Sequence, residues 1–83
     1  MSKTEKTIKR LLARPADFSW TELRALMIHF NYELKTSGGS GRKFIHKQSQ
    51  ATFFIHEPHP AKVLKSYQVR DAIHFLRQER HIS

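Results

Sequence analysis

Three of the six histidines lie in a segment that is also rich in lysine and arginine. His46, His56 and His59 would approach one another, and the glycine cluster at 38–41, if this segment formed adjacent antiparallel strands. The cations around them are Arg42, Lys43, Lys47, Lys62 and Lys65. A histidine that titrates near neutrality, beside cations that hold a phosphodiester, is the equipment of a metal-independent ribonuclease. Such an enzyme needs a base for the ribose 2′-hydroxyl, an acid for the leaving oxygen, and cations for the developing phosphorane charge.

Other interpretations of these histidines remain open at this point. Spacing alone does not distinguish a ribonuclease site from polar histidines at the edge of a sheet. The sequence HEPHP at 56–60 looks superficially like a zinc-protease motif, but its second histidine comes one residue too early and its two prolines exclude the helix. A third metal ligand is not evident nearby. We therefore predict no metal site and no cofactor.

All three glycines fall within the four residues 38–41 and are followed at once by two cations. Glycine lets the backbone turn sharply and approach a bulky ligand. We predict a tight turn between two strands, where backbone N–H groups of Gly39 and Ser40 meet a phosphate together with Arg42 and Lys43. The segment is not a nucleotide-binding P-loop, because the GK[ST] ending and the wider spacing are missing.

The overall charge supports an anionic partner. Fifteen Lys and Arg against seven Asp and Glu give a formal charge of +8 on 83 residues, which attracts polyanions such as RNA. Cysteine is absent, so disulfides and thiolate zinc sites are excluded. The apolar runs are too short to cross a bilayer, and the first residues lack the apolar core of a signal peptide. These features predict a cytoplasmic location and no membrane partner.

The pattern of the whole sequence predicts a single α+β domain over 1–83. Capping boxes starting at Ser2 and Ser19 predict two helices, and Ser66 is the predicted cap of a third. The first two helices are expected at about 3–13 and from about 20 to 31 or 32, and the strands at about 33–37, 42–47 and 51–57. The second and last helices each offer an apolar stripe to one face of an antiparallel meander. Alternation allows only one of Phe44 and Ile45 to point into that core.

Aromatic residues serve either the core or the ligand. In so small a chain, we expect at least two of Phe53, Phe54 and Tyr67 to be core residues, although all three side chains have the chemistry to stack on RNA bases. The spacing predicts a surface position for His29 and His74, and a frayed terminus at His81.

From about Trp20 to Ile82 the chain resembles the HicA family, the toxins of bacterial toxin–antitoxin pairs. Three blocks carry the likeness: TELRALMIHFNYEL, GGSGRKFIHK and HEPHPAKVLKSYQVRDAIHFL. The resemblance implies a fold like the double-stranded-RNA-binding domain, α-β-β-β-α with a three-stranded antiparallel sheet. Residues 19–83 would form this core and residues 1–18 an N-terminal helical extension. It also implies an mRNA interferase that cleaves mRNA, inhibits translation and growth, and is silenced by a cognate HicB-like antitoxin.

One position departs from the family pattern. Where the family has a catalytic histidine directly after Gly-Ser, this chain has Gly41. The resemblance leaves His46, at the family's F-x-H position, and His59, at its P-H-P position, as candidate catalytic residues. His59 is preferred because Lys62 follows closely. The residues expected to bind RNA are Gly39, Ser40, Arg42, Lys43, Lys47, His56, Lys62 and Lys65.

Two rival functions are compatible with the same residues. Glycine at position 41 favours an RNA-binding module that does not cleave RNA. The basic residues of the last helix favour a structural or DNA-binding adaptor instead; they are Lys65, Arg70, Arg77 and Arg80. Retained RNA binding without cleavage would identify the first rival, and a preference for duplex DNA over single-stranded RNA would identify the second.

Overall fold

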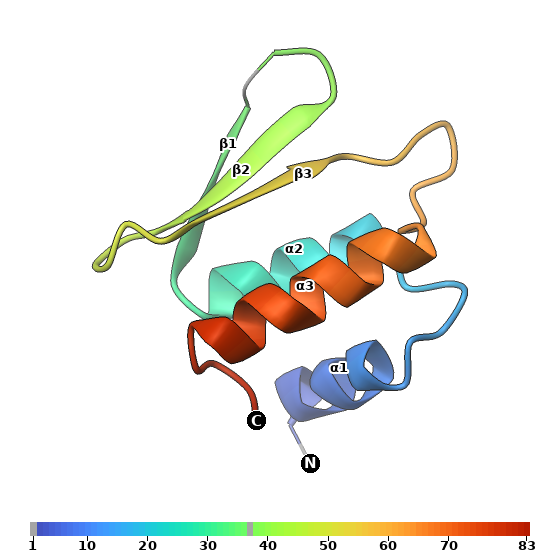
Figure 1. The fold of residues 1–83 in the computed structure, drawn as a ribbon. Helices are drawn as coiled ribbons and strands as arrows, with labels where there is room; N and C mark the ends of the chain where they lie inside the picture. Colours follow the sequence, from blue (N-terminus) through green and yellow to red (C-terminus); the bar gives the residue numbers. More distant parts are fainter. Residues whose placement is uncertain (1, 37) are drawn as a thin grey trace.

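Two helices cover one face of a three-stranded antiparallel sheet, and a third helix packs against those two, in the computed structural model, which describes residues 2–36 and 38–83 (Figure 1). The elements are α1 (Lys3–Leu12), α2 (Trp20–His29), β1 (Tyr32–Thr36), β2 (Gly41–His46), β3 (Thr52–His56) and α3 (Ser66–Gln78). The strands lie side by side in the order β1-β2-β3. The predicted α+β class and the predicted order of elements are confirmed.

Two of the three predicted helix starts are confirmed. The Ser2 hydroxyl accepts a hydrogen bond from the backbone N–H of Glu5 at 3.1 Å. Ser19 and Glu22 form a complete capping box, in which each side chain accepts a hydrogen bond from the other residue's backbone N–H at 3.1 Å. These bonds satisfy amide groups that the first turn of a helix leaves without intrahelical partners.

The start of α3 differs from the prediction. Ser66 is the first helical residue, and Lys65 is the N-cap. The buried Gln68 side chain accepts a hydrogen bond from the Lys65 backbone N–H at 3.0 Å and donates one to the His56 carbonyl at 3.0 Å. One amide side chain therefore both caps the helix and ties its start to the end of β3, which a motif search for Ser, Thr or Asp caps does not reveal.

The helix-to-strand transition comes slightly earlier than predicted. Helix α2 ends at His29, because Asn31 adopts a left-handed conformation with φ of 75° that a helix cannot continue. Each strand begins and ends within one residue of its predicted range. The last residue of the predicted first strand, Ser37, lies outside the described residues.

Alternation along the strands decides which face is core. The Phe44 side chain is fully buried, and Phe53 and Ile55 are at most 8% exposed. Ile45 therefore lies on the opposite, open face. Among the described residues, the helices contribute further large buried side chains: Leu11, Trp20, Leu23, Leu26, Met27, Val69, Ile73 and Leu76. Tyr32 from β1 and Phe18 and Leu64 from the connecting segments are buried with them. Among the described residues, no helix lies on the open face (Figure 1) and none has the length and apolar character of a bilayer span.

The expectation that at least two of Phe53, Phe54 and Tyr67 would be core residues is wrong. Only Phe53 is buried, whereas Phe54 is 69% exposed and Tyr67 is 48% exposed. Phe54 alternates with two inward-pointing residues, so its side chain must project from the open face. Two aromatic rings are therefore available to a ligand.

Helix α1 is part of the same core. Leu11 is fully buried in it, and Ile8 packs against it. On the surface, the Arg10 guanidinium bridges to Glu22 at 2.7 Å and to Asp17 at 3.3 Å, which holds α1 against the start of α2. The N-terminal segment thus packs on the domain.

Candidate functional site

The glycine turn joins β1 to β2 as predicted. Gly38 and Gly39 have φ of 90° and 51°, and the Gly41 N–H donates to the Gly38 carbonyl at 3.0 Å. The Arg42 guanidinium donates to the carbonyls of Gly39 and Gly41, both at 2.9 Å. Arg42 is therefore engaged in closing the turn, while Lys43 projects from the opposite face of β2.

A carboxylate that the sequence analysis did not single out organises the cations beside this turn. Glu57 Oε1 accepts from Arg42 Nε at 3.1 Å, and Glu57 Oε2 accepts from Lys62 Nζ at 2.6 Å. Lys62, followed by Arg42, holds the pKa of Glu57 below its ordinary value. The available signal was that Glu57 is the one acidic residue between Glu33 and Asp71.

A serine–histidine pair lies on the other side of the turn. Ser40 Oγ and His56 Nδ1 are 3.2 Å apart. His56 ends β3 and is exposed, and its Cα partner in the ladder is Gly41. When Nδ1–H of the neutral ring donates to Ser40 Oγ, Nε2 carries the lone pair of a base; in the imidazolium Nδ1–H still donates to Ser40 Oγ, and Nε2–H is the acid. The pair can therefore orient the ring in either role.

The loop between β3 and α3 adds a second histidine to this pair. His56, His59, Ser40 and Lys65 line one hollow of about 330 Å³. A neighbouring hollow of about 500 Å³ is lined by Gly39, Ser40, Arg42, Glu57, His59, Pro60 and Lys62. Backbone hydrogen bonds from Trp20 N to the Lys62 carbonyl at 2.9 Å and from Leu64 N to the Phe18 carbonyl at 2.8 Å anchor the end of this loop. We call these two hollows, at the end of the sheet beside the glycine turn, the turn site.

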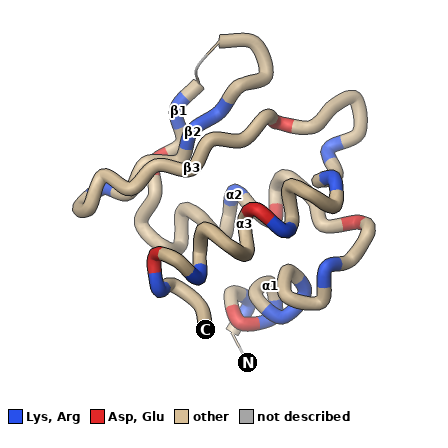
Figure 2. The backbone as a smooth tube through the Cα atoms, in the orientation of Figure 1, with Lys and Arg blue, Asp and Glu red and all other residues tan. Residues whose placement is uncertain are grey.

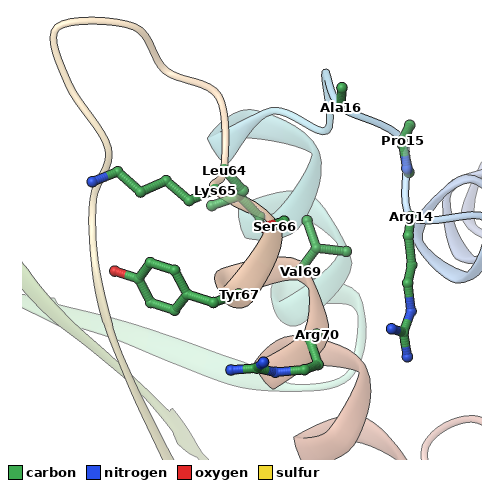
Figure 3. A pocket seen from close by; sticks show the side chains of 9 residues that line it. All are labelled: Arg14, Pro15, Ala16, Leu64, Lys65, Ser66, Tyr67, Val69 and Arg70. Atoms are coloured by element: carbon green, nitrogen blue, oxygen red, sulfur yellow. The ribbon is translucent and has the colours of Figure 1, made fainter.

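A third hollow, of about 660 Å³, lies between the segment after α1 and the start of α3 (Figure 3). Its lining includes Arg14, Val69 and Arg70, and it shares Lys65 and Tyr67 with the turn site. Figure 3 shows the Lys65 and Tyr67 side chains extending away from Arg14 and toward the loop between β3 and α3. Lys65 and Tyr67 therefore lie between the two hollows and line both of them.

Three predicted site residues do not join the turn site. Lys43 lies on the open face of β2. His46 and Lys47 lie at the opposite end of that strand, and His46 comes five positions after Gly41, about 17 Å along an antiparallel strand. His46 Nδ1 instead accepts the backbone N–H groups of residues 48 and 49 at 3.2 and 3.1 Å, which caps the turn before β3.

The expectation of a frayed terminus at His81 is wrong. His81 Nε2 and the Tyr32 hydroxyl are 2.8 Å apart. The His81 ring stacks on Phe30 and on His46, with centroid separations of 4.9 and 5.7 Å. Burial, followed by the charge of His46, lowers the pKa of His81, and burial raises the pKa of Tyr32 to about 12. His29 and His74 are exposed, so their predicted surface positions are confirmed.

The burial of His81 among these rings predicts that the stability of the domain depends on pH. Because the pKa of His81 is lowered below 6.5 in the folded chain, the unfolded chain takes up the proton first as the pH falls. His81 therefore contributes its full stabilisation above about pH 6.5, and this contribution is lost as the pH falls through the pKa of His81 in the folded chain. We expect the Tm difference between wild type and His81→Gln to be smaller at about pH 5 than at about pH 7.5. A difference that is equal at both pH values would contradict this account, and His74→Gln is the matched exposed control.

The turn site combines two histidines, two lysines and Ser40, which line two neighbouring hollows beside the glycine turn. These are the groups that acid–base cleavage of a phosphodiester requires. Comparison of the chain with models of protein families, with curated proteins and with solved structures gave no significant match. Function is therefore inferred from this geometry and from the sequence.

Proposed function

We propose that this protein is a metal-independent endoribonuclease, a toxin of the HicA type that cleaves mRNA and thereby inhibits translation and growth. One observation carries the proposal: His56, oriented by Ser40, shares a hollow with His59 and Lys65. A pair of histidines beside lysines, on a protein of charge +8, suits a polyanionic substrate that is cleaved by proton transfer.

In the proposed mechanism, His56 Nε2 takes the proton of a ribose 2′-hydroxyl. The 2′-oxygen attacks the adjacent phosphorus, the bond from phosphorus to the 5′-oxygen breaks, and His59 protonates that leaving oxygen. The products are a 2′,3′-cyclic phosphate and a 5′-hydroxyl. Lys62 and Lys65 stabilise the charge that develops on the phosphorane oxygens. The Ser40 hydroxyl keeps the His56 ring oriented in both protonation states.

The ladder between β2 and β3 offers a reason why Gly41 is compatible with this activity. Gly41 and His56 are Cα partners, and directly opposed residues project their side chains from the same face as near neighbours. A histidine at position 56 therefore presents its ring close to where a histidine at 41 would present one. We propose that His56 performs the role that the HicA motif gives to the residue after Gly-Ser.

The fold and the partners belong to the same proposal. Helices on one face of a three-stranded antiparallel sheet suit a fold like the double-stranded-RNA-binding domain. The proposed partners are mRNA and a cognate HicB-like antitoxin in the cytoplasm. An antitoxin that presents acidic groups to Lys62, Lys65 and the turn would block the site through charge complementarity.

A second candidate function is an RNA-binding module without nuclease activity. The observation that favours it is the glycine at position 41, which cannot act as a base. The same lysines and the same turn would then bind the phosphate backbone without cleaving it.

Incubation with a long mRNA in excess EDTA separates the two functions. We expect the wild type to cut the RNA in EDTA, because histidines and not metal ions carry the protons. The His56→Ala/His59→Ala double variant should leave the RNA intact and still retard it on a gel. A folded wild-type protein that retards the RNA but never cuts it would favour the binding module.

A further inference from the structure

The open face of the sheet carries an exposed aromatic ring next to the candidate base. Phe54 is 69% exposed, the largest exposure among the large hydrophobic residues described. Phe54 and His56 are two residues apart on β3, so their side chains project from the same face about 6.7 Å apart along the strand. Such an exposed ring adds nothing to the core and is available to a ligand.

The two side chains also line one hollow. It has a volume of about 210 Å³ and is lined by Gly38, Gly41, Arg42, Phe54, Ile55 and His56. Its wall at position 41 has no side chain, which leaves space between the glycine turn and the Phe54 ring. A flat group placed there would contact the ring on one side and His56 on another.

A row of cations extends across the sheet from this ring. Lys43 is the Cα partner of Phe54 on one side and of Lys35 on the other. Figure 2 shows the basic segments of β1 and β2 adjoining there. Lys43 is the cation nearest the ring in the ladder, because it is the direct partner of Phe54. Lys35, on the next strand, is paired with Glu33 at 3.7 Å. The face thus offers an aromatic surface with a positive charge beside it.

We infer that Phe54 is a base-stacking site for single-stranded RNA, on which the base next to the scissile phosphate stacks while Lys43 contacts the backbone. This inference rests on the proposed ribonuclease function. Bases can stack on an aromatic side chain only when they are not paired within a duplex, and such stacking is tolerant of sequence. The site therefore predicts cleavage of unpaired segments, with little preference for a particular base.

Binding is best measured separately from cleavage. The probe is a fluorescein-labelled, fully 2′-O-methylated oligonucleotide of about 12 residues, which lacks the nucleophilic hydroxyl; a hairpin of the same composition supplies the duplex. We expect Phe54→Ala to weaken binding of the single strand by about 5- to 150-fold. Phe54→Tyr keeps the ring and should stay within about threefold of the wild type.

Two further variants distinguish stacking from charge and from unspecific loss. Ile28→Ala removes another exposed hydrophobic side chain, from α2, and should change affinity by less than about twofold. Lys43→Gln should lower the slope of log affinity against log salt by about 0.7, whereas Phe54→Ala should leave it unchanged.

Each outcome decides a different claim. Equal affinity of the wild type and Phe54→Ala for the single strand, or tighter binding of the hairpin, would overturn the stacking site and leave the nuclease proposal standing if RNA is still cut. In the first case the open face would be free for a protein partner. A folded wild type that binds neither probe and cuts no RNA would overturn both proposals.

Discussion

Replacing His56 with alanine is expected to slow RNA cleavage by about 10²–10⁴-fold, the usual contribution of a general acid or base. The fold should survive, because His56 is exposed and its side chain contributes one hydrogen bond, to Ser40. The rate is best measured under single-turnover conditions in EDTA, beside thermal unfolding of each variant. Affinity for the uncleavable oligonucleotide should change far less than the rate, since the phosphate contacts come from lysines.

Three other histidine variants give this prediction its control. His59→Ala should cause a loss of similar size, because the leaving oxygen then lacks its acid. His74→Ala, on an exposed helix position, should cleave at the wild-type rate. His46→Ala should also keep its activity if it folds, since His46 lies at the far end of β2. Full activity of His56→Ala combined with an inactive, folded His46→Ala would transfer the catalytic assignment to His46.

Replacing Leu11 with alanine is expected to lower the free energy of unfolding by about 2–5 kcal/mol. Leu11 comes from α1, yet it is fully buried in the same cluster as the side chains of α2, α3 and the sheet. A domain of this size has about 4–12 kcal/mol of stability, so the expected loss is a large fraction of the total. Urea denaturation followed by circular dichroism measures the change.

The neighbouring residue supplies the matched control for Leu11. Leu12 is 38% exposed, so Leu12→Ala removes the same atoms from a position that is partly in contact with water. We expect a loss well below that of Leu11→Ala. Equal losses in the two variants would mean that α1 does not pack as described, and that residues 1–18 contribute little to the stability of the domain.

Much of the fold could be predicted because its determinants are local. The capping box at Ser19, the apolar spacing of α2 and the glycines of the β1–β2 turn each specify an element within a few residues. The α3 cap was missed because the N-cap residue, Lys65, has no side-chain acceptor, and the capping bond is instead made by Gln68, three residues on. Which face of β2 is core also required the helices, because Phe44 and Ile45 are both suitable core residues.

The candidate site was predicted less completely, for a related reason. The sequence pointed to His46, His56 and His59, with the cations around them, as possible residues for phosphodiester chemistry, but spacing does not give the register that places His56 opposite Gly41. Glu57 went unnoticed because its function lies in its two cation contacts. The small size of the chain led to the expectation that at least two of Phe53, Phe54 and Tyr67 are core residues, whereas alternation with Phe53 puts Phe54 on the open face.

Cleavage of an oligonucleotide that contains one ribonucleotide in an otherwise 2′-O-methylated strand would test the central claim most directly. The protein is incubated with it in EDTA, and the products are identified by mass spectrometry. We expect one cut, on the 3′ side of the single ribose, leaving a 2′,3′-cyclic phosphate and a 5′-hydroxyl. Cleavage at methylated positions, products ending in a 5′-phosphate, or no cleavage by a folded protein that binds the strand would contradict the histidine mechanism.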